Sequence, residues 1–299
     1  MKGQTGTDTR FRFEQGQTTE LAYYGLGATP LFACQADQRF SYCLYVPTSY
    51  PQDQDREWPL AVIVHGTDRP AQGYRDAFAD FAEEHTCIIL APLFPGGITA
   101  PWELNSYKFM RAEDVRFDHV LLAMVDEVAS AYNIDARRFL IHGFSGGGHF
   151  SHRMFYLHPD RLLGVSIGAP GVVTLLDEEH DWWVGVRNLE EIFGTEIDIA
   201  AMRQVAVHMV VGGNDVDTWE ITVTPDTRLW MVGANMAGAN RQDRMISLKQ
   251  SFERHGIRVR HTVVEGLGHE GFKVLDPVKQ FFADVLAERR PSQAEVPAS

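Results

Sequence analysis

Short apolar runs alternate with amphipathic segments through most of the chain. The run PLAVIVHG (59–66) is continuously apolar and ends at a glycine, which is typical of a strand buried on both faces of a sheet. The segment after it carries Tyr74, Phe78 and Phe81 at spacings of four and three, which predicts one amphipathic helix. The alternation continues in strands and helices predicted at 86–92, 118–134, 137–143, 146–160, 162–171, 205–213, 241–256, 259–266 and 277–290.

Strands that alternate with helices indicate βαβ units, and therefore an α/β fold with a mostly parallel central sheet and helices on both faces. The segment 32–50 differs, because its aromatic and polar residues alternate with a period near two. It predicts an antiparallel hairpin added at the sheet edge. Two stretches, 172–204 and 216–242, do not fit the alternation of strands and helices. We expect them to form a cap-like insertion, since insertions at the carboxyl side of parallel strands commonly shape a pocket.

The pattern is continuous, and no linker rich in glycine, serine or proline interrupts it. We therefore expect a single domain over residues 21–289, with flexible polar segments at 1–20 and 290–299. The first twenty residues contain no apolar h-region, so no secretory peptide is expected. Nothing approaches eighteen consecutive apolar residues, which argues against a membrane-spanning helix.

The net charge and the cysteines limit the classes of partner and the compartment that we expect for this protein. The 299 residues carry 27 Lys and Arg against 40 Asp and Glu, a formal net charge of −13. A chain this acidic is repelled by nucleic acid and by anionic membrane surfaces. The three cysteines, Cys34, Cys43 and Cys87, lack metal-ligand spacing and predict a reduced, cytoplasmic protein. A bridge between Cys34 and Cys43, which lie in neighbouring predicted strands, is the alternative. The oligomeric state stays open.

One turn carries a clear chemical signal. The sequence Gly143-Phe144-Ser145-Gly146-Gly147 stands directly after an apolar strand and directly before a helix. GxSxG in this context predicts a nucleophile elbow, which lifts the serine hydroxyl clear of the sheet and points helix N–H groups at developing negative charge. The flanking glycines are expected because a Cβ there would collide with the neighbouring strand and helix.

A serine hydroxyl needs a base, and the base needs an acid that orients it. In nucleophile-elbow hydrolases the acid and then the histidine follow the serine, each at the end of a strand. The loop VVGGNDVDT offers Asp215, with Asp217 as the alternative, and the loop EGLGHEGF offers His269. His149 and His152 have helical spacing but no third ligand nearby, so neither a metal site nor a cofactor is expected.

Acyl transfer also needs donors for the oxyanion. We expect one to be the backbone N–H of Gly146, which follows the nucleophile, and the other to come from the loop VIVHGTDRP, with Thr67 first and Asp68 second. Tryptophans in the loops after the strands, Trp230 among them, predict an aromatic-lined pocket. Candidate substrate-binding residues are Asp68, Trp102, Phe144, His149, Trp182, Trp183 and Trp219.

The run YNIDARRFLIHGFSGGGHFSHRMFYLHPDRLLGVSIGAPG, with PLAVIVHG before it and VVGGND and GLGH after it, resembles the α/β-hydrolase superfamily. Within it the chain is similar to the polyhydroxybutyrate depolymerase and feruloyl esterase-like serine esterases, over residues 40–285. The resemblance implies Ser145 as nucleophile, Asp215 as acid and His269 as base. The chain departs from the group in its HGTDR loop, its Trp-rich insertion and the missing export signal.

These departures favour a small ester, lactone or amide as substrate over a polymer. We expect a serine hydrolase that cleaves a carboxylic ester or lactone with a bulky or aromatic group. An amidase or peptidase, or an acyltransferase, with the same triad is the alternative.

Overall fold

The computed structural model describes residues 24–289. They fall into two compact units, one up to Phe139 and one from Leu140, which are considered in turn. The flexible segments expected at 1–20 and 290–299 lie outside the described residues. The expectation of a single domain stays a prediction.

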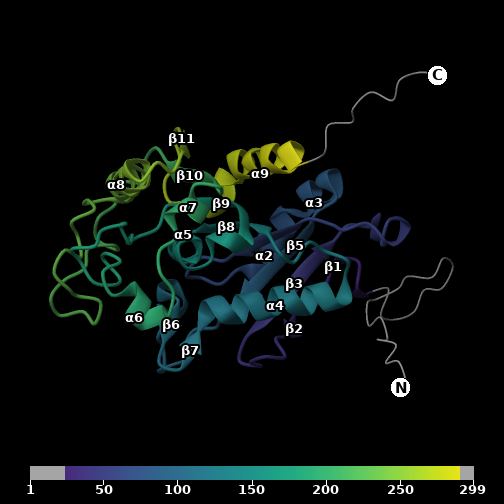
Figure 1. The fold of residues 1–299 in the computed structure, drawn as a ribbon, viewed down its shortest axis with the longest axis horizontal. Coiled ribbons are helices and arrows are strands. Elements are labelled where there is room, and N and C mark those ends of the chain that lie inside the picture. The colour runs from purple at the N-terminus through teal and green to yellow at the C-terminus, as the bar shows by residue number, and fades with distance from the viewer. Residues whose placement is uncertain (1–23, 290–299) are drawn as a thin grey trace. The chain divides into compact units, whose positions relative to one another are not determined.

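The first unit combines short and long strands with three helices (Figure 1). Its strands are β1 (Gly27–Ala28), β2 (Phe32–Ala33), β3 (Ser41–Val46), β4 (Leu60–Val64), β5 (Ile88–Leu93), β6 (Arg111–Ala112) and β7 (Val115–Arg116). Its helices are α2 (Ala71–Ala77), α3 (Ala79–His85) and α4 (Phe117–Ala131), with 3-10 turns at Tyr50–Gln52 and Ser106–Phe109.

The sheet of the first unit runs in the order β1-β3-β5-β4. All five residues of β4 are buried, as its apolar run predicts, and β4 pairs with β5 in parallel. The predicted hairpin is confirmed, because β2 pairs antiparallel with β3, with Phe32 opposite Tyr42. Strand β3 then joins the sheet antiparallel to β5. The mixed sheet therefore arises where the hairpin is added.

Two predicted helices differ in their limits. The helix expected after β4 is broken at Phe78, whose backbone leaves helical geometry between α2 and α3. The bend keeps the rings of Phe78 and Phe81 in the core, with centroids 5.9 Å apart. Helix α4 ends before Tyr132, because the next residues pair with another segment: Trp58 N donates to Asn133 O at 2.8 Å.

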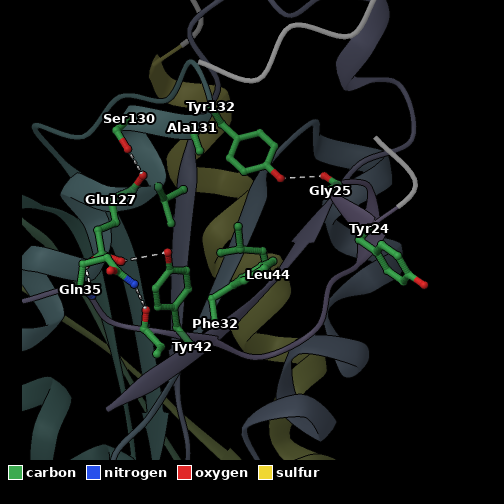
Figure 2. A pocket seen from close by; sticks show the side chains of 12 residues that line it. Tyr24, Gly25, Phe32, Gln35, Tyr42, Leu44, Glu127, Ser130, Ala131 and Tyr132 are labelled. Carbon is green, nitrogen blue, oxygen red and sulfur yellow. Dashed lines mark hydrogen bonds between the residues drawn. The ribbon is translucent and has the colours of Figure 1, made fainter. Parts of the chain in front are cut away.

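A pocket of about 310 Å³ opens in the first unit between the β2–β3 hairpin and α4 (Figure 2). Tyr42 donates its hydroxyl to Glu127 at 3.2 Å, and Tyr132 donates to the carbonyl oxygen of Gly25 at 2.8 Å. The polar groups of the wall thus bond to one another, and the lining that remains for a ligand is mainly apolar.

The three cysteines all belong to this unit and are buried free thiols. Burial raises the pKa of all three thiols, that of Cys43 to about 11. They are therefore protonated and unreactive at neutral pH. No helix of residues 24–289 is long and apolar enough to cross a membrane.

The second unit holds four strands and the remaining helices (Figure 1). The strands are β8 (Phe139–Phe144), β9 (Leu162–Gly168), β10 (Ala206–Gly212) and β11 (Val259–Val264). The helices are α5 (Gly146–Leu157), α6 (Leu189–Phe193), α7 (Ile199–Met202), α8 (Arg241–Arg254) and α9 (Leu275–Arg289), with 3-10 turns at Pro159–Arg161 and Gly271–Val274.

The strand order here is β8-β9-β10-β11, with β10 parallel to both of its neighbours. Helix α9, yellow in Figure 1, lies along β9 and β10, and its Phe281 stacks on His208 of β10 with centroids 5.1 Å apart. Helices α5 and α8 pack on the other face, where Phe155 meets Phe252 edge to face at 5.5 Å. The strand ends on which the predicted site depends are held between these two layers.

Candidate active site

Ser145 occupies the turn between β8 and α5. Its backbone has φ 56° and ψ −114°, a conformation that residues other than glycine rarely adopt. The Ser145 N–H donates to Gly168 O at 2.8 Å, which ties the turn to the end of β9. Strain of this kind is held by the surrounding structure and recurs at functional sites. The serine itself is half-buried, at the first turn of α5.

Close backbone packing surrounds this turn. A Cβ on Gly143 would lie 2.2 Å from Gly147 O, and a Cβ on Gly148 would lie 2.2 Å from Gly168 O. Gly143 is thus required where the sequence expects it, since the strand and the helix approach too closely for a side chain. The equally strict requirement at Gly148 was not foreseen. It arises because α5 runs directly over the end of β9.

Asp215 and His269 meet at the ends of β10 and β11. The Nδ1–H of His269 donates to Oδ2 of Asp215 at 2.6 Å. The opposite ring atom, Nε2 of His269, is buried and has no hydrogen-bond partner among residues 24–289. The imidazole packs on the ring of Phe144, with centroids 4.7 Å apart. The imidazole of His269 therefore lies beside the residue that precedes Ser145.

Backbone contacts between the two loops explain why these side chains meet. Gly212 and Val264 are opposite each other in the parallel pairing of β10 with β11. Beyond the strands, Gly213 N donates to Val264 O at 2.8 Å and Asn214 N donates to Leu267 O at 2.7 Å. A Cβ on Gly212 would lie 2.3 Å from Gly268 O. The loop that carries Asp215 (the acid loop) and the loop that carries His269 (the base loop) thus run together as far as Asp215.

Asp215 and the alternative acid, Asp217, have different surroundings. Asp215 is buried, with 1% of its side chain exposed, whereas Asp217 is exposed. The second oxygen of Asp215, Oδ1, accepts from Nη1 of Arg241 at 3.2 Å. Arg241 was not foreseen, because nothing in the sequence RQDR at the start of α8 distinguishes it from a surface residue.

The two predicted oxyanion donors belong to different units. Gly146 begins α5, and an N–H at that position has no acceptor within its own helix. Thr67 and Asp68 follow β4 in the first unit, and their part in an oxyanion hole stays a prediction. In that unit Arg69 donates to Thr67 O and, at 3.0 Å, to Phe94 O. Arg69 therefore stabilises the loop that follows β4.

Two histidines of α5 hold the loop that follows β9. Nε2 of His149 accepts from Gly171 N at 2.8 Å, and Nε2 of His152 accepts from Thr174 N at 3.1 Å. Burial, together with the nearby Arg153 charge, lowers the pKa of His152 well below its usual value, so this ring is neutral and can accept. His149 thus shapes the start of the insertion 172–204.

The two insertions pack against each other within the second unit. Trp183 is buried, and its indole N–H donates to Leu229 O at 3.1 Å. Trp182 packs edge to face on Phe193 at 4.9 Å. The remaining predicted pocket tryptophans lie at the surface: Trp219 is 79% exposed, Trp230 44% and, in the first unit, Trp102 94%.

A second serine–histidine pair lies inside the sheet. Oγ of Ser166 is 3.0 Å from Nδ1 of His208 and 3.1 Å from Nδ1 of His142, and Nε2 of His208 is 3.0 Å from the hydroxyl of Thr262. Ser166 and both histidines are fully buried. This row crosses the four strands and cannot reach a substrate, so we assign it to the stability of the sheet.

The buried histidines of this row, His142 and His208, predict that the fold is less stable at acid pH. Burial lowers the pKa of His142 to about 4 and that of His208 to about 3, below the value near 6.5 of an unfolded chain. As pH falls from about 6.5 toward these folded-state values, the unfolded chain binds protons that the folded chain does not, and stability is lost. Between pH 7 and pH 5 we expect each of the two histidines to lower the free energy of unfolding by about 2 kcal/mol.

Urea unfolding at pH 7 and pH 5, of the wild type and of His208→Gln, measures this loss. The variant should lose about 2 kcal/mol less than the wild type over the same interval. Equal losses in the two proteins would contradict the assignment.

The observed fold defines the structural class of the chain. The chain has the α/β-hydrolase fold, with strands, helices and a strand–serine–helix turn in the order that the sequence predicts. No protein-family model matches the chain, and no curated protein sequence does. The similarity to known proteins therefore comes from solved structures, and the three described next are distant in sequence.

Three of these structures cover most of the chain. Poly(aspartic acid) hydrolase-1 from Sphingomonas sp. KT-1 matches with a TM-score of 0.67 and 20% identity, over 85% of this chain and 97% of its own. LpqC, a poly(3-hydroxybutyrate) depolymerase from Bordetella parapertussis, matches with 0.64 and 24%, over 85% and 86%. A ferulic acid esterase matches with 0.60 and 16%, over 86% and 96%. The resemblance predicted from the sequence is thus confirmed for the fold.

Proposed function

We propose that this protein is a serine hydrolase that cleaves a carboxylic ester or lactone through an acyl-enzyme on Ser145. The observation that carries the proposal is the Asp215–His269 pair, whose Nε2 is unpartnered among the described residues and whose imidazole packs on Phe144, the residue before the strained Ser145. A serine, a base that is oriented by a buried acid, and N–H groups at a helix start are the parts that acyl transfer requires.

The chemistry follows from these atoms. Nε2 of His269 takes the proton of the Ser145 hydroxyl as Oγ attacks the ester carbonyl carbon. Asp215 holds Nδ1–H and stabilises the imidazolium, while the N–H group of Gly146 donates to the oxyanion. The imidazolium then protonates the leaving alcohol, and an acyl-enzyme remains. Water gives a proton to the same nitrogen and attacks the acyl carbon. The bond between the acyl carbon and Oγ then breaks, the imidazolium returns its proton to Oγ of Ser145, and the acid is released.

We propose a substrate with a bulky or aromatic group. The exposed Trp219, which follows Asp215 on the acid loop, and Trp230 in the same insertion support this proposal. Aromatic side chains supply large contact area for apolar ligand groups. Trp182 and Trp183 support it less directly, because they pack within the insertions and fix their shape.

A panel of nitrophenyl esters that differ only in the acyl group tests this choice. The kcat/KM for benzoyl or cinnamoyl esters should exceed that for the acetyl ester. The Ser145→Ala variant, assayed on the same panel, corrects for spontaneous hydrolysis. Fastest turnover of the acetyl ester would contradict the proposed preference.

Amide hydrolysis is the second candidate. It is supported by the similarity to a hydrolase of poly(aspartic acid), whose units are joined by amide bonds. The same triad can cleave either bond. Matched ester and anilide substrates with one acyl group separate the two, because an amidase would cleave the anilide at a rate comparable to the ester.

A further inference from the structure

The guanidinium of Arg241 contacts the Asp215–His269 pair from the side opposite the imidazole. Its Nη1 donates to Oδ1 of Asp215 at 3.2 Å, while Oδ2 accepts from His269 at 2.6 Å. Arg241 and Asp215 are each only 2% exposed. A buried carboxylate is costly unless its oxygens are bonded, and Arg241 supplies the partner that His269 cannot.

The other branch of the guanidinium reaches the second insertion. Nη2 of Arg241 donates to Oε2 of Glu220 at 2.6 Å, and half of the Glu220 side chain is exposed. Glu220 follows the exposed Trp219. The next residue of α8, Gln242, donates to Gly213 O at 2.6 Å. The start of α8 therefore holds the acid loop and the insertion together.

We propose that Arg241 is a positioning residue of this site, and that Glu220 sets how strongly the positive charge of Arg241 acts on the Asp215–His269 pair. Arg241 turns the carboxylate so that Oδ2 faces the imidazole. It also couples the insertion that carries Trp219 to the base. The proposal rests on the proposed function, because a positioning role requires that His269 act as the base.

The charges around the pair act in opposite directions. Removal of the positive charge of Arg241 takes away a repulsion that an imidazolium at His269 would meet. Glu220 partly neutralises Arg241, so removal of its negative charge should strengthen that repulsion. The base works only when neutral, so a weaker repulsion should move the acid limb of the kcat/KM profile to higher pH and a stronger one to lower pH. The two substitutions should therefore move the limb in opposite directions.

Other charged groups among the described residues lie on the two loops of the pair. Asp217 and Glu265 are exposed, and Glu270 pairs with Lys273 at 2.5 Å. The ring of Phe144, which packs on the imidazole, carries no charge. Because the variants below leave all of these groups unchanged, the differences between them report on Arg241 and Glu220.

The experiment is the pH dependence of kcat/KM for the wild type, Arg241→Gln and Glu220→Gln. In Arg241→Gln the acid limb should move up by about one pH unit, and kcat should fall about 10- to 100-fold as the pair loses its alignment. In Glu220→Gln the limb should move down by about 0.3 pH unit, because solvent screens this half-exposed group. Arg241→Lys keeps the charge and should keep the limb near the wild-type pH, with only partial rescue of kcat.

Lys249→Gln is the matched control. Lys249 lies on α8 as well but pairs with Glu253 at the surface, at 2.7 Å, so its profile should equal that of the wild type. Acid limbs at the wild-type pH in both Arg241→Gln and Glu220→Gln would overturn the proposal, even if kcat falls, because a merely structural role would not move the limb. If Arg241→Gln does not fold, the position of the acid limb in Glu220→Gln alone tests the proposal.

Failure of the proposed function looks different. In that case Ser145→Ala would keep the wild-type activity. Loss of activity in Ser145→Ala together with unmoved limbs would leave the serine hydrolase intact and remove only the role of Arg241.

Discussion

Replacing Ser145 with alanine should lower turnover by about 10⁴- to 10⁶-fold on any ester that the wild type cleaves. The variant keeps the fold, because the backbone of the turn is fixed by Gly168 O and by the close packing of Gly143 and Gly148. It loses the hydroxyl that we propose as the nucleophile. Steady-state kinetics on one good ester measures the loss, and thermal unfolding checks that the variant is folded.

Ser166→Ala is the matched control for this prediction. Ser166 lies within hydrogen-bond distance of a histidine, but the pair is fully buried in the sheet. Its replacement should change stability and leave turnover within about tenfold of the wild type. The assignment of the nucleophile would be wrong if folded Ser166→Ala lost activity while Ser145→Ala kept it.

Replacing Asp215 with asparagine should lower kcat by about 10⁴-fold. An amide in this position can offer its NH₂ group to Nδ1 and so favour the wrong tautomer of His269. It also removes one of the two carboxylates that pair with the buried Arg241, so that only Glu220 remains as its ionic partner. The measurement is kcat on the ester used for Ser145→Ala, with stability recorded in parallel.

The comparison with Asp217→Asn completes this prediction. Asp217 is exposed on the same loop, and its replacement should change kcat by less than about threefold. A larger loss of kcat in Asp217→Asn than in Asp215→Asn would reverse the choice of acid.

Local sequence patterns predicted the strands and candidate site residues that depend only on short stretches of the chain. The continuous apolar runs located the strands because buried strands need apolar residues on both faces. The GxSxG turn located Ser145 because its chemistry requires glycines and a strand–helix junction next to each other in sequence. The order of the loops after β10 and β11 pointed to Asp215 and His269, since parallel strands end at one edge of a sheet.

Contacts that join distant segments could not be predicted in this way. Arg241 lies 26 positions after Asp215 in the sequence, beyond an irregular insertion, and no local pattern encodes their contact. Gly148 is required only because α5 passes over β9. The break at Phe78 interrupts an otherwise regular helical spacing. Each of these features follows from tertiary packing, which overrides local propensity.

The central claim is that Ser145 is the nucleophile of a serine hydrolase. A fluorophosphonate probe reacts with an activated serine, and mass spectrometry of the digested protein identifies the labelled residue. The wild type should be labelled at Ser145, Ser145→Ala should not be labelled, and His269→Ala should be labelled much more slowly, because the hydroxyl then lacks its base. Labelling of Ser145→Ala as strong as that of the wild type, or labelling at another serine, would contradict it.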